Sequence, residues 1–97
     1  MEFLVAIDVK LPPDTPAERR AELVAAEAVR ARELAAAGVI VRLWRIPGRW
    51  SNVGLWVAPD ASALHEAVSS LPLHPWLDVQ VTALARHPSD PGPPGGE

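Results

Sequence analysis

Hydrophobic and polar side chains alternate at the start of the chain. Apolar residues occupy every second position from 3 to 11 and alternate with the charged residues Glu2, Asp8 and Lys10. A repeat of two is typical of a β-strand that buries one face. Pro12 and Pro13 end the pattern, because proline cannot donate to a strand ladder.

A long helix is predicted next. The chain is rich in Ala, Glu, Arg and Leu up to Ala37, and Gly38 stops the pattern. Asp14 or Thr15 is expected to cap the N-terminus, and Pro16 suits the first helical turn. The segment is long enough for roughly six turns.

The remaining pattern predicts two strands, a second helix and a last strand. Residues 39–46 and 52–57 are β-branched and aromatic runs separated by a turn, residues 59–71 form a short amphipathic helix, and residues 76–84 form the final strand. The order β-α-β-β-α-β predicts a ferredoxin-like α+β fold, an antiparallel sheet with both helices on one face. Residues 1–87 are expected to form one domain. Residues 88–97, of which seven are Pro or Gly, form a tail.

The second predicted strand is apolar on both faces. If residues alternate, Val41 and Leu43 point one way while Ile40, Trp44 and Ile46 point the other. Two helices on one side of a sheet cover only one of these faces. Because large exposed apolar patches are uncommon on monomers, we expect a homo-oligomer.

The composition of the chain excludes several classes of function. The chain has 97 residues, 48% of them hydrophobic, a net charge of −3 and no cysteine. This excludes disulfides and thiolate metal sites and argues against a nucleic-acid partner. No apolar run reaches 18 residues, and the N-terminus lacks a basic segment before its apolar stretch, so we expect neither a membrane span nor a signal peptide. The expected location is the cytoplasm.

Glu27 is a candidate catalytic residue. On a helical wheel with Leu23 at 0°, Leu34 falls near 20° and Glu27 near 40°, inside the apolar stripe. A carboxylate removed from water is either paired or protonated more readily. Two interpretations follow: an ion pair with Arg20 or Arg30, which flank the stripe, or a carboxylate base in a cleft.

A second candidate group surrounds the predicted turn between the two central strands. Arginine, asparagine and indole side chains could hold a small organic anion there, or could form a subunit interface. The residues of this group are Trp44, Arg45, Arg49, Trp50, Asn52 and Trp56.

The histidines do not indicate a metal site. His65, His74 and His87 lack the spacing of metal-ligating motifs, and no glycine-rich phosphate loop is present. We therefore expect acid–base chemistry without a cofactor or metal.

Several motifs keep the mutual spacing of a known family. They are residues 9–12 (VKLP), residues 43–46 (LWRI) with Gly48 and Asn52, Leu64 with His65, residues 71–79 (LPLHPWLDV), and residues 87–89 (HPS). With these motifs the chain resembles muconolactone isomerase without gaps from about residue 3 to 90. It differs from typical members at Arg42 and Arg49, where they have histidine, and at Trp50, where they have tyrosine.

The resemblance implies a ferredoxin-like fold, a decamer with pockets at subunit contacts, and no cofactor. It implies conversion of muconolactone to 3-oxoadipate enol-lactone in aromatic catabolism, with Glu27 at the position of the family's proposed base. For that reaction Asn52 or Arg45 is the expected donor to the dienolate oxygen. Arg49 or Arg42 is expected to bind the substrate carboxylate, and the indoles and His65 complete the binding residues.

Three alternatives stay open at this point. The enzyme could act on another lactone or on a secondary metabolite, since a fold and its family do not fix the substrate. The chain could be a non-catalytic ligand-binding or assembly module in which Glu27 only forms an ion pair. It could also be a related α+β enzyme that binds haem or oxidises an aromatic compound through His65 or His74.

Overall fold

The computed structural model describes residues 1–92 and confirms the expected order of elements. The chain forms β1 (Glu2–Val9), α1 (Ala17–Ala36), β2 (Ile40–Arg45), β3 (Ser51–Val57), α2 (Ala61–Ser69), a 3-10 helix η1 (His74–Trp76) and β4 (Leu77–Leu84). Neither α1 nor α2 is long and apolar enough to cross a membrane.

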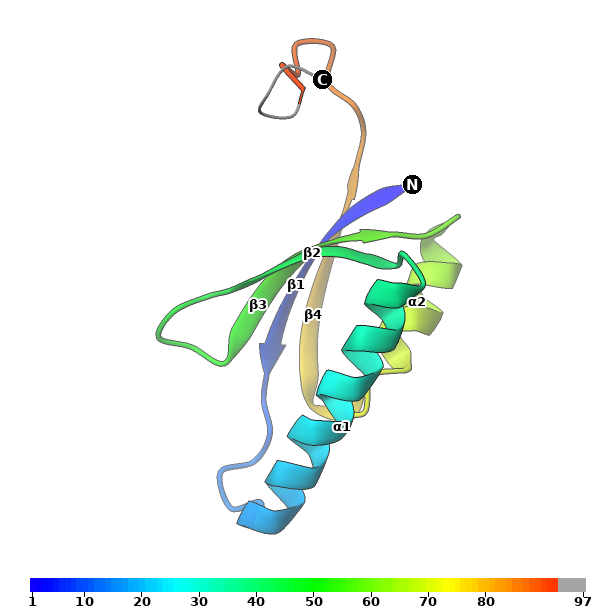
Figure 1. Cartoon of the computed structure of the whole chain (residues 1–97). Helices are drawn as coiled ribbons and strands as arrows, with labels where there is room; N and C mark the ends of the chain where they lie inside the picture. The colour runs from blue at the N-terminus through cyan, green and yellow to red at the C-terminus, as the bar shows by residue number, and fades with distance from the viewer. Residues whose placement is uncertain (93–97) are drawn as a thin grey trace.

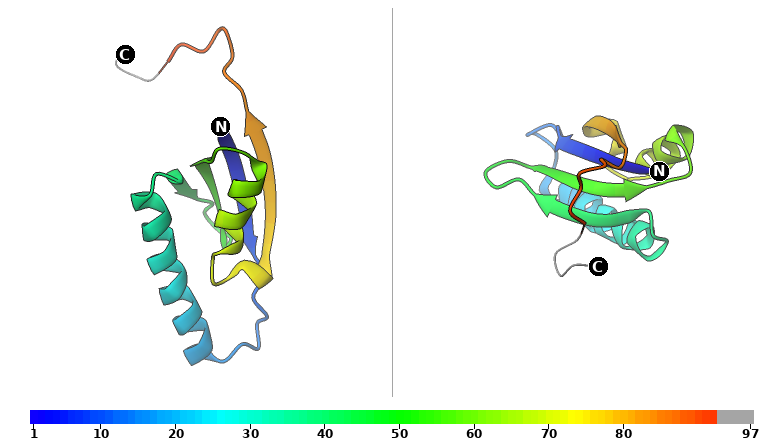
Figure 2. Two further views of the ribbon diagram at one scale, coloured as in Figure 1. Left: turned by 90° about the vertical axis from the view of Figure 1, so that its right-hand side faces the viewer. Right: turned by 90° about the horizontal axis from the view of Figure 1, so that it is seen from above.

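The four strands form one antiparallel sheet in the order β2-β3-β1-β4 (Figure 1). Both helices lie on one side of it (Figure 2), which confirms the ferredoxin-like expectation. The sheet face that meets the helices is called here the helix face, and the opposite one the far face. The strands β2 and β4 are the edges.

The core lies between the helix face and the two helices. Phe3, Val5 and Ile7 of β1 are at most 4% exposed and alternate with more accessible neighbours, as the repeat of two predicts. They pack in one cluster with apolar residues of the other elements: Leu34, Ile40, Trp56, Ala58, Leu64, Val68 and Leu71.

The predicted alternation along the second strand is wrong. The register of β2 on β3 shifts between Ile40 and Arg42, so one extra residue is inserted on β2. Ile40 pairs with Trp56 and Leu43 with Gly54, which places both on the helix face, whereas Arg42 and Trp44 face the other way. A bulge of this kind reverses the facing of every residue that follows it.

The expected N-terminal cap of the first helix is also wrong. Pro16 occupies the cap position of α1, and no side chain caps it. The Thr15 hydroxyl instead donates to the Pro12 carbonyl oxygen at 2.6 Å, closing the preceding turn. In α2 the cap is conventional, since the Asp60 carboxylate accepts from the Ala63 N–H at 2.8 Å.

Residues 85–92 extend from the end of β4 away from the body of the molecule (Figure 1). They contain no helix or strand, in line with their proline content. The rest of the expected tail, residues 93–97, lies outside the described part of the chain.

A substitution at Gly54 tests how closely the β2 bulge packs on β3. A Cβ there would lie 2.9 Å from the Arg42 carbonyl oxygen and 3.0 Å from Trp56 Nε1. We expect Gly54→Ala to lower the free energy of unfolding by about 1–3 kcal/mol, measured by urea denaturation. The control Ala83→Gly, on exposed β4, should lower it by about 0.5–1 kcal/mol, because alanine is favoured where space is open. A stabilised Gly54→Ala variant would contradict this view.

Candidate functional site

The candidate site lies at the end of the sheet where β1 finishes and β3 begins. The Val9 N–H donates to the Trp50 carbonyl oxygen at 2.9 Å, and the Lys10 N–H donates to that of Trp76 at 2.7 Å. These two bonds tie the end of β1 to the turn before β3 on one side and to η1 on the other. The first turns of α1 extend beyond this end of the sheet (Figure 1).

Glu27 is partly buried on the inner side of α1. Its Oε1 accepts a hydrogen bond from the Leu73 N–H at 3.0 Å, from the segment between α2 and η1. Burial raises the pKa of the Glu27 carboxyl above its usual range, and the hydrogen bond from Leu73 offsets part of that rise. The raised pKa brings the Glu27 carboxyl closer to the pH at which the protein works, which favours a group that both accepts and returns a proton.

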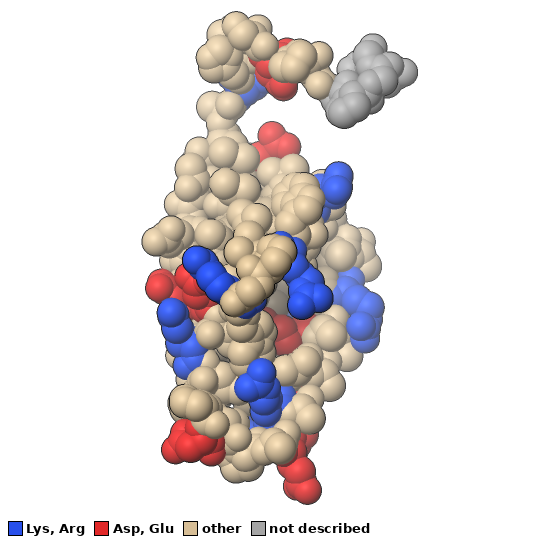
Figure 3. Space-filling model, turned by 90° about the vertical axis from the view of Figure 1, so that its left-hand side faces the viewer, with Lys and Arg blue, Asp and Glu red and all other residues tan. Residues whose placement is uncertain are grey.

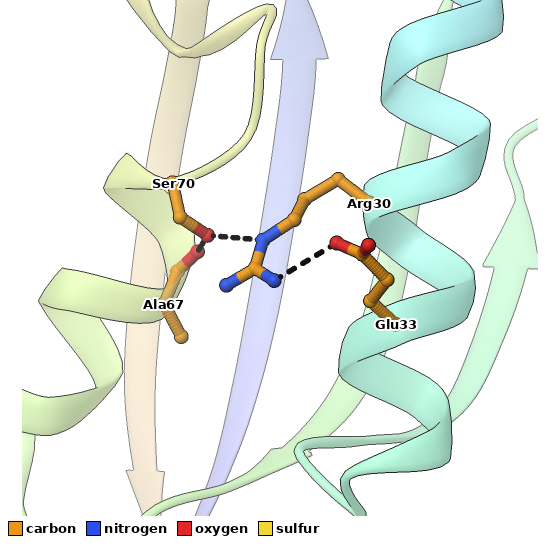
Figure 4. Close-up of polar contacts among 4 residues, drawn as sticks. All are labelled: Arg30, Glu33, Ala67 and Ser70. Carbon is orange, nitrogen blue, oxygen red and sulfur yellow. Dashed lines mark hydrogen bonds and ion pairs between the residues drawn. The ribbon is translucent and has the colours of Figure 1, made fainter.

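The ion pair considered for Glu27 is not formed. Arg30 donates from Nε to the Ser70 hydroxyl at 2.9 Å and from Nη1 to Glu33 at 3.1 Å (Figure 4). Arg20 stacks on the Trp50 ring, with Cζ 4.4 Å from the ring centroid. Within residues 1–92, the Glu27 carboxylate has no salt bridge.

A groove of about 690 Å³ separates the first half of α1 from β2 and the start of β3. We call it the arginine groove. On one face of the molecule, Figure 3 shows basic side chains around a hollow in which acidic atoms are visible. The groove is lined by Arg20, Val24, Leu43, Trp44, Arg45, Arg49, Trp50, Ser51 and Asn52. Glu27 is one turn of α1 beyond Val24, so it lies next to the groove rather than in its lining.

Arg45 and Asn52 are cross-strand partners in the arginine groove. Asn52 also pairs with Ile7, whose side chain is buried under the helices, so Asn52 and Arg45 share the helix face. Asn52 Oδ1 is buried and has no hydrogen-bond partner in the described part of the chain. A buried polar atom without a partner is costly, and such atoms are common where a ligand or water completes the site.

Asp8 forms an ion pair with Arg49, one of the arginines that line the arginine groove. It accepts hydrogen bonds from the Ser51 hydroxyl and from Arg49 Nη2, the latter at 3.2 Å. The Ser51 hydrogen bond, followed by the charge of Arg49, lowers the pKa of the Asp8 carboxyl, although desolvation opposes the change. Arg49 thus has an acidic partner before any substrate arrives.

Three of the expected site residues lie elsewhere. Arg42 is on the far face, with Cζ 5.0 Å from the centroid of the Trp44 ring. Trp56 is 1% exposed and belongs to the core. His65 lies on the other side of the molecule, in a second cavity.

The second cavity has a volume of about 440 Å³ and lies between α2 and β4. The rings of His65 and His74 meet edge to face at its border, with centroids 6.4 Å apart. Glu27 does not line this cavity, although His74 follows Leu73 directly in the chain. Across residues 1–92, no three His, Asp or Glu side chains gather as a metal site.

Chemically, the site combines a carboxylate of raised proton affinity, an amide and several guanidinium groups. This set can move a proton on a small anion while stabilising negative charge that forms on an oxygen. Two parts of it were missed by sequence reasoning. The Leu73 N–H is a backbone donor without a side-chain signature, and the stacking of Arg20 on Trp50 joins residues that are distant in the chain.

Several known proteins are similar to this chain in sequence. The family model described as muconolactone delta-isomerase matches residues 1–90. Muconolactone Delta-isomerase 2 of Acinetobacter lwoffii is 43% identical over 92% of this chain and 93% of its own length. The Pseudomonas aeruginosa enzyme of that name is 39% identical over 92% of this chain and 93% of its own.

A solved structure agrees with the same assignment. The crystal structure of a muconolactone isomerase matches with a TM-score of 0.87 and 39% sequence identity, over 93% of this chain and 94% of that one. Sequence and structure are thus similar over nearly the whole length of both chains, and the chain belongs to the muconolactone delta-isomerase family.

Proposed function

We propose that this protein isomerises muconolactone to 3-oxoadipate enol-lactone, using Glu27 as the proton-transferring base. The observation that carries the proposal is the environment of Glu27. Its carboxylate is partly buried, accepts one backbone hydrogen bond and has no salt bridge within residues 1–92, and burial raises its pKa. Family membership supports the choice of substrate.

The reaction moves one proton within the substrate. The Glu27 carboxylate removes the proton from the γ carbon of the lactone, and the electrons of that C–H bond spread through the ring to the carbonyl oxygen as a dienolate. The protonated Glu27 then returns a proton to the α carbon, and the ring double bond shifts from the α,β to the β,γ position. One carboxyl group performs both steps, so the balance needs no oxidant and no cofactor.

The dienolate oxygen requires a donor while it carries charge. Arg45 and the Asn52 amide are cross-strand partners on the helix face, the face over which α1 places Glu27. Charge-assisted hydrogen bonds of this kind act mainly on the transition state, and the loss of one typically lowers the rate on the order of 100-fold.

Replacing the base should remove activity without harming the fold. In Glu27→Gln the amide oxygen can still accept the Leu73 hydrogen bond, but it cannot take up the proton. We expect turnover of muconolactone to fall roughly 100-fold or more, followed by ultraviolet absorbance. Turnover is the primary readout. Deuterium at the α carbon of product formed in deuterated water, detected by proton NMR, would show that the proton on Glu27 exchanges with solvent before it is returned.

The matched control is Glu22→Gln, which removes an exposed carboxylate from the same helix and should leave turnover unchanged. Thermal unfolding adds a second readout. Because the carboxylate of Glu27 is desolvated and has no salt bridge within residues 1–92, Glu27→Gln should not destabilise the protein at pH 7. A destabilisation of about 3–5 kcal/mol with retained activity would instead indicate a structural ion pair and contradict the proposal.

The pH dependence follows from the raised pKa of Glu27. The base acts only when ionised, so kcat/KM should fall as the solution is acidified through the folded-state pKa, with a midpoint above the ordinary glutamate value of 4.5. Stability responds in the opposite direction. The folded protein holds the Glu27 proton more tightly than the unfolded chain does. The contribution of Glu27 to the free energy of unfolding therefore increases as the solution is acidified through that range. A midpoint at or below 4.5 would contradict Glu27 as the base.

We also propose that the chain forms a homo-oligomer, and the apolar far face supports this. The family resemblance implies a decamer, and the expected location is the cytoplasm. Leu4 and Trp44 of this face are 38% and 44% exposed, and β3 adds Val53 and Leu55 beside them. An apolar sheet face of this kind is typical of one covered by another copy of the chain.

Light scattering tests the assembly. We expect a mass of about ten times the 10.4 kDa of one chain. Leu55→Glu should reduce that mass by placing a charge on the far face, whereas Val29→Glu, at an exposed position of α1, should not. A wild-type mass of one chain at micromolar concentration would refute the assembly.

A further inference from the structure

We propose that Arg20, held over the ring of Trp50, is the residue that binds the carboxylate of the substrate. The inference rests on the proposed function, because it assumes a small lactone acid between α1 and the sheet. It differs from the sequence-based expectation, in which Arg49 or Arg42 had that role.

The structure distinguishes the arginines by their existing partners. Arg42 lies on the far face over Trp44 and does not line the arginine groove. Arg49 lines the groove, but Asp8 accepts its hydrogen bond at 3.2 Å, so a substrate carboxylate would compete with an ion pair. Arg20 and Arg45 also line it, and neither forms a salt bridge among the described residues.

Position separates the two remaining arginines. Arg45 is the cross-strand partner of Asn52 on the sheet, so it belongs to the polar pair assigned to the dienolate oxygen. Arg20 approaches from the opposite wall, on α1. The carbonyl oxygen of the lactone and the carboxylate lie on different parts of the substrate. Two separate cations on opposite walls of the groove match that arrangement.

Helix geometry places Arg20 in register with the base. Arg20 and Glu27 are seven residues apart, so they point in nearly the same direction from α1 and are separated by two turns, roughly 10 Å. That span is about the distance from a carboxylate oxygen to the γ carbon of the lactone, with a contact of about 3 Å at each end. The γ carbon bears the carboxymethyl group, so a carboxylate held by Arg20 directs that carbon along α1 toward Glu27.

Trp50 acts as a positioning residue for Arg20. With Cζ 4.4 Å from the ring centroid, the guanidinium uses its flat face for the contact with the indole. Its N–H donors lie in the plane of the group and stay free for a carboxylate, which such a fork can bind through two parallel hydrogen bonds. The stacking also limits the conformations of a long, exposed side chain before the substrate binds.

The test compares an acid with its uncharged ester in matched variants. Muconolactone and its methyl ester are assayed with the wild type, Arg20→Gln and the control Arg19→Gln, which removes an exposed charge next to Arg20 that does not line the arginine groove. We expect Arg20→Gln to lower kcat/KM for the acid by roughly 10- to 100-fold, mainly through KM, and to leave the ester unchanged. Arg19→Gln should behave as the wild type with both.

Binding without turnover separates this inference from the proposed function. The saturated lactone acid cannot undergo the double-bond shift, so its affinity, measured by calorimetry, depends on recognition alone. Arg20→Gln should weaken it by a similar factor, and Trp50→Leu by a smaller factor that disappears in the Arg20→Gln background. If the wild type binds this acid through Arg20 but does not isomerise muconolactone, the carboxylate site stands and the reaction fails.

Several outcomes would overturn the inference. One is an equal loss for acid and ester in Arg20→Gln, since the effect would then not involve the carboxylate. Another is a loss of the preference for the acid in Arg49→Gln while Arg20→Gln retains it. An equal effect of Arg19→Gln and Arg20→Gln would show only a general influence of positive charge, and it would also refute a specific contact.

Discussion

The hydrogen bond from the Leu73 N–H to Glu27 is the contact on which the site depends. It fixes a carboxylate between α1 and the segment before η1 while adding no positive charge. A guanidinium in its place would favour the ionised form and weaken the base. The two arginines of α1 closest to this stripe are both engaged elsewhere, Arg30 by Ser70 and Glu33 and Arg20 by the Trp50 ring. These contacts together preserve the raised pKa of Glu27.

The bulge in β2 decides which of its side chains face the helices, on the side of the sheet where Glu27 lies. Without the extra residue between Ile40 and Arg42, strict alternation would place Arg42 and Trp44 on the helix face and Arg45 on the far face. With it, Leu43 and Arg45 face the helices, and Arg45 becomes the partner of Asn52. Gly54 opposite Leu43 has no side chain, so β2 approaches β3 closely at this point. One inserted residue thus assigns the polar pair to the site.

The elements and the position of Glu27 could be predicted because periodicity is a local property of the sequence. The strand at residues 3–11 and the stripe containing Glu27 both depend on the spacing of neighbouring side chains. The bulge could not be predicted in this way, since it reflects how β2 fits on β3, and neither strand shows it alone. The partners of the arginines could not be predicted for a similar reason: Arg49 is paired with Asp8, 41 residues away in the chain. Long-range pairing decides which charges remain available.

Alternation along β2 also links the site to the proposed assembly. Trp44 points to the far face and Arg45 to the helix face, so adjacent residues of one strand serve the two sides of the sheet. Because β2 is an edge strand, β3 is the one strand that pairs with it in the described part of the chain. A neighbouring copy packed on Trp44 would restrict β2 from the other side and, through the same backbone, hold Arg45 beside Asn52. In this arrangement the cover over the far face would contact Trp44, which also lines the arginine groove, and so contribute to the geometry of the site.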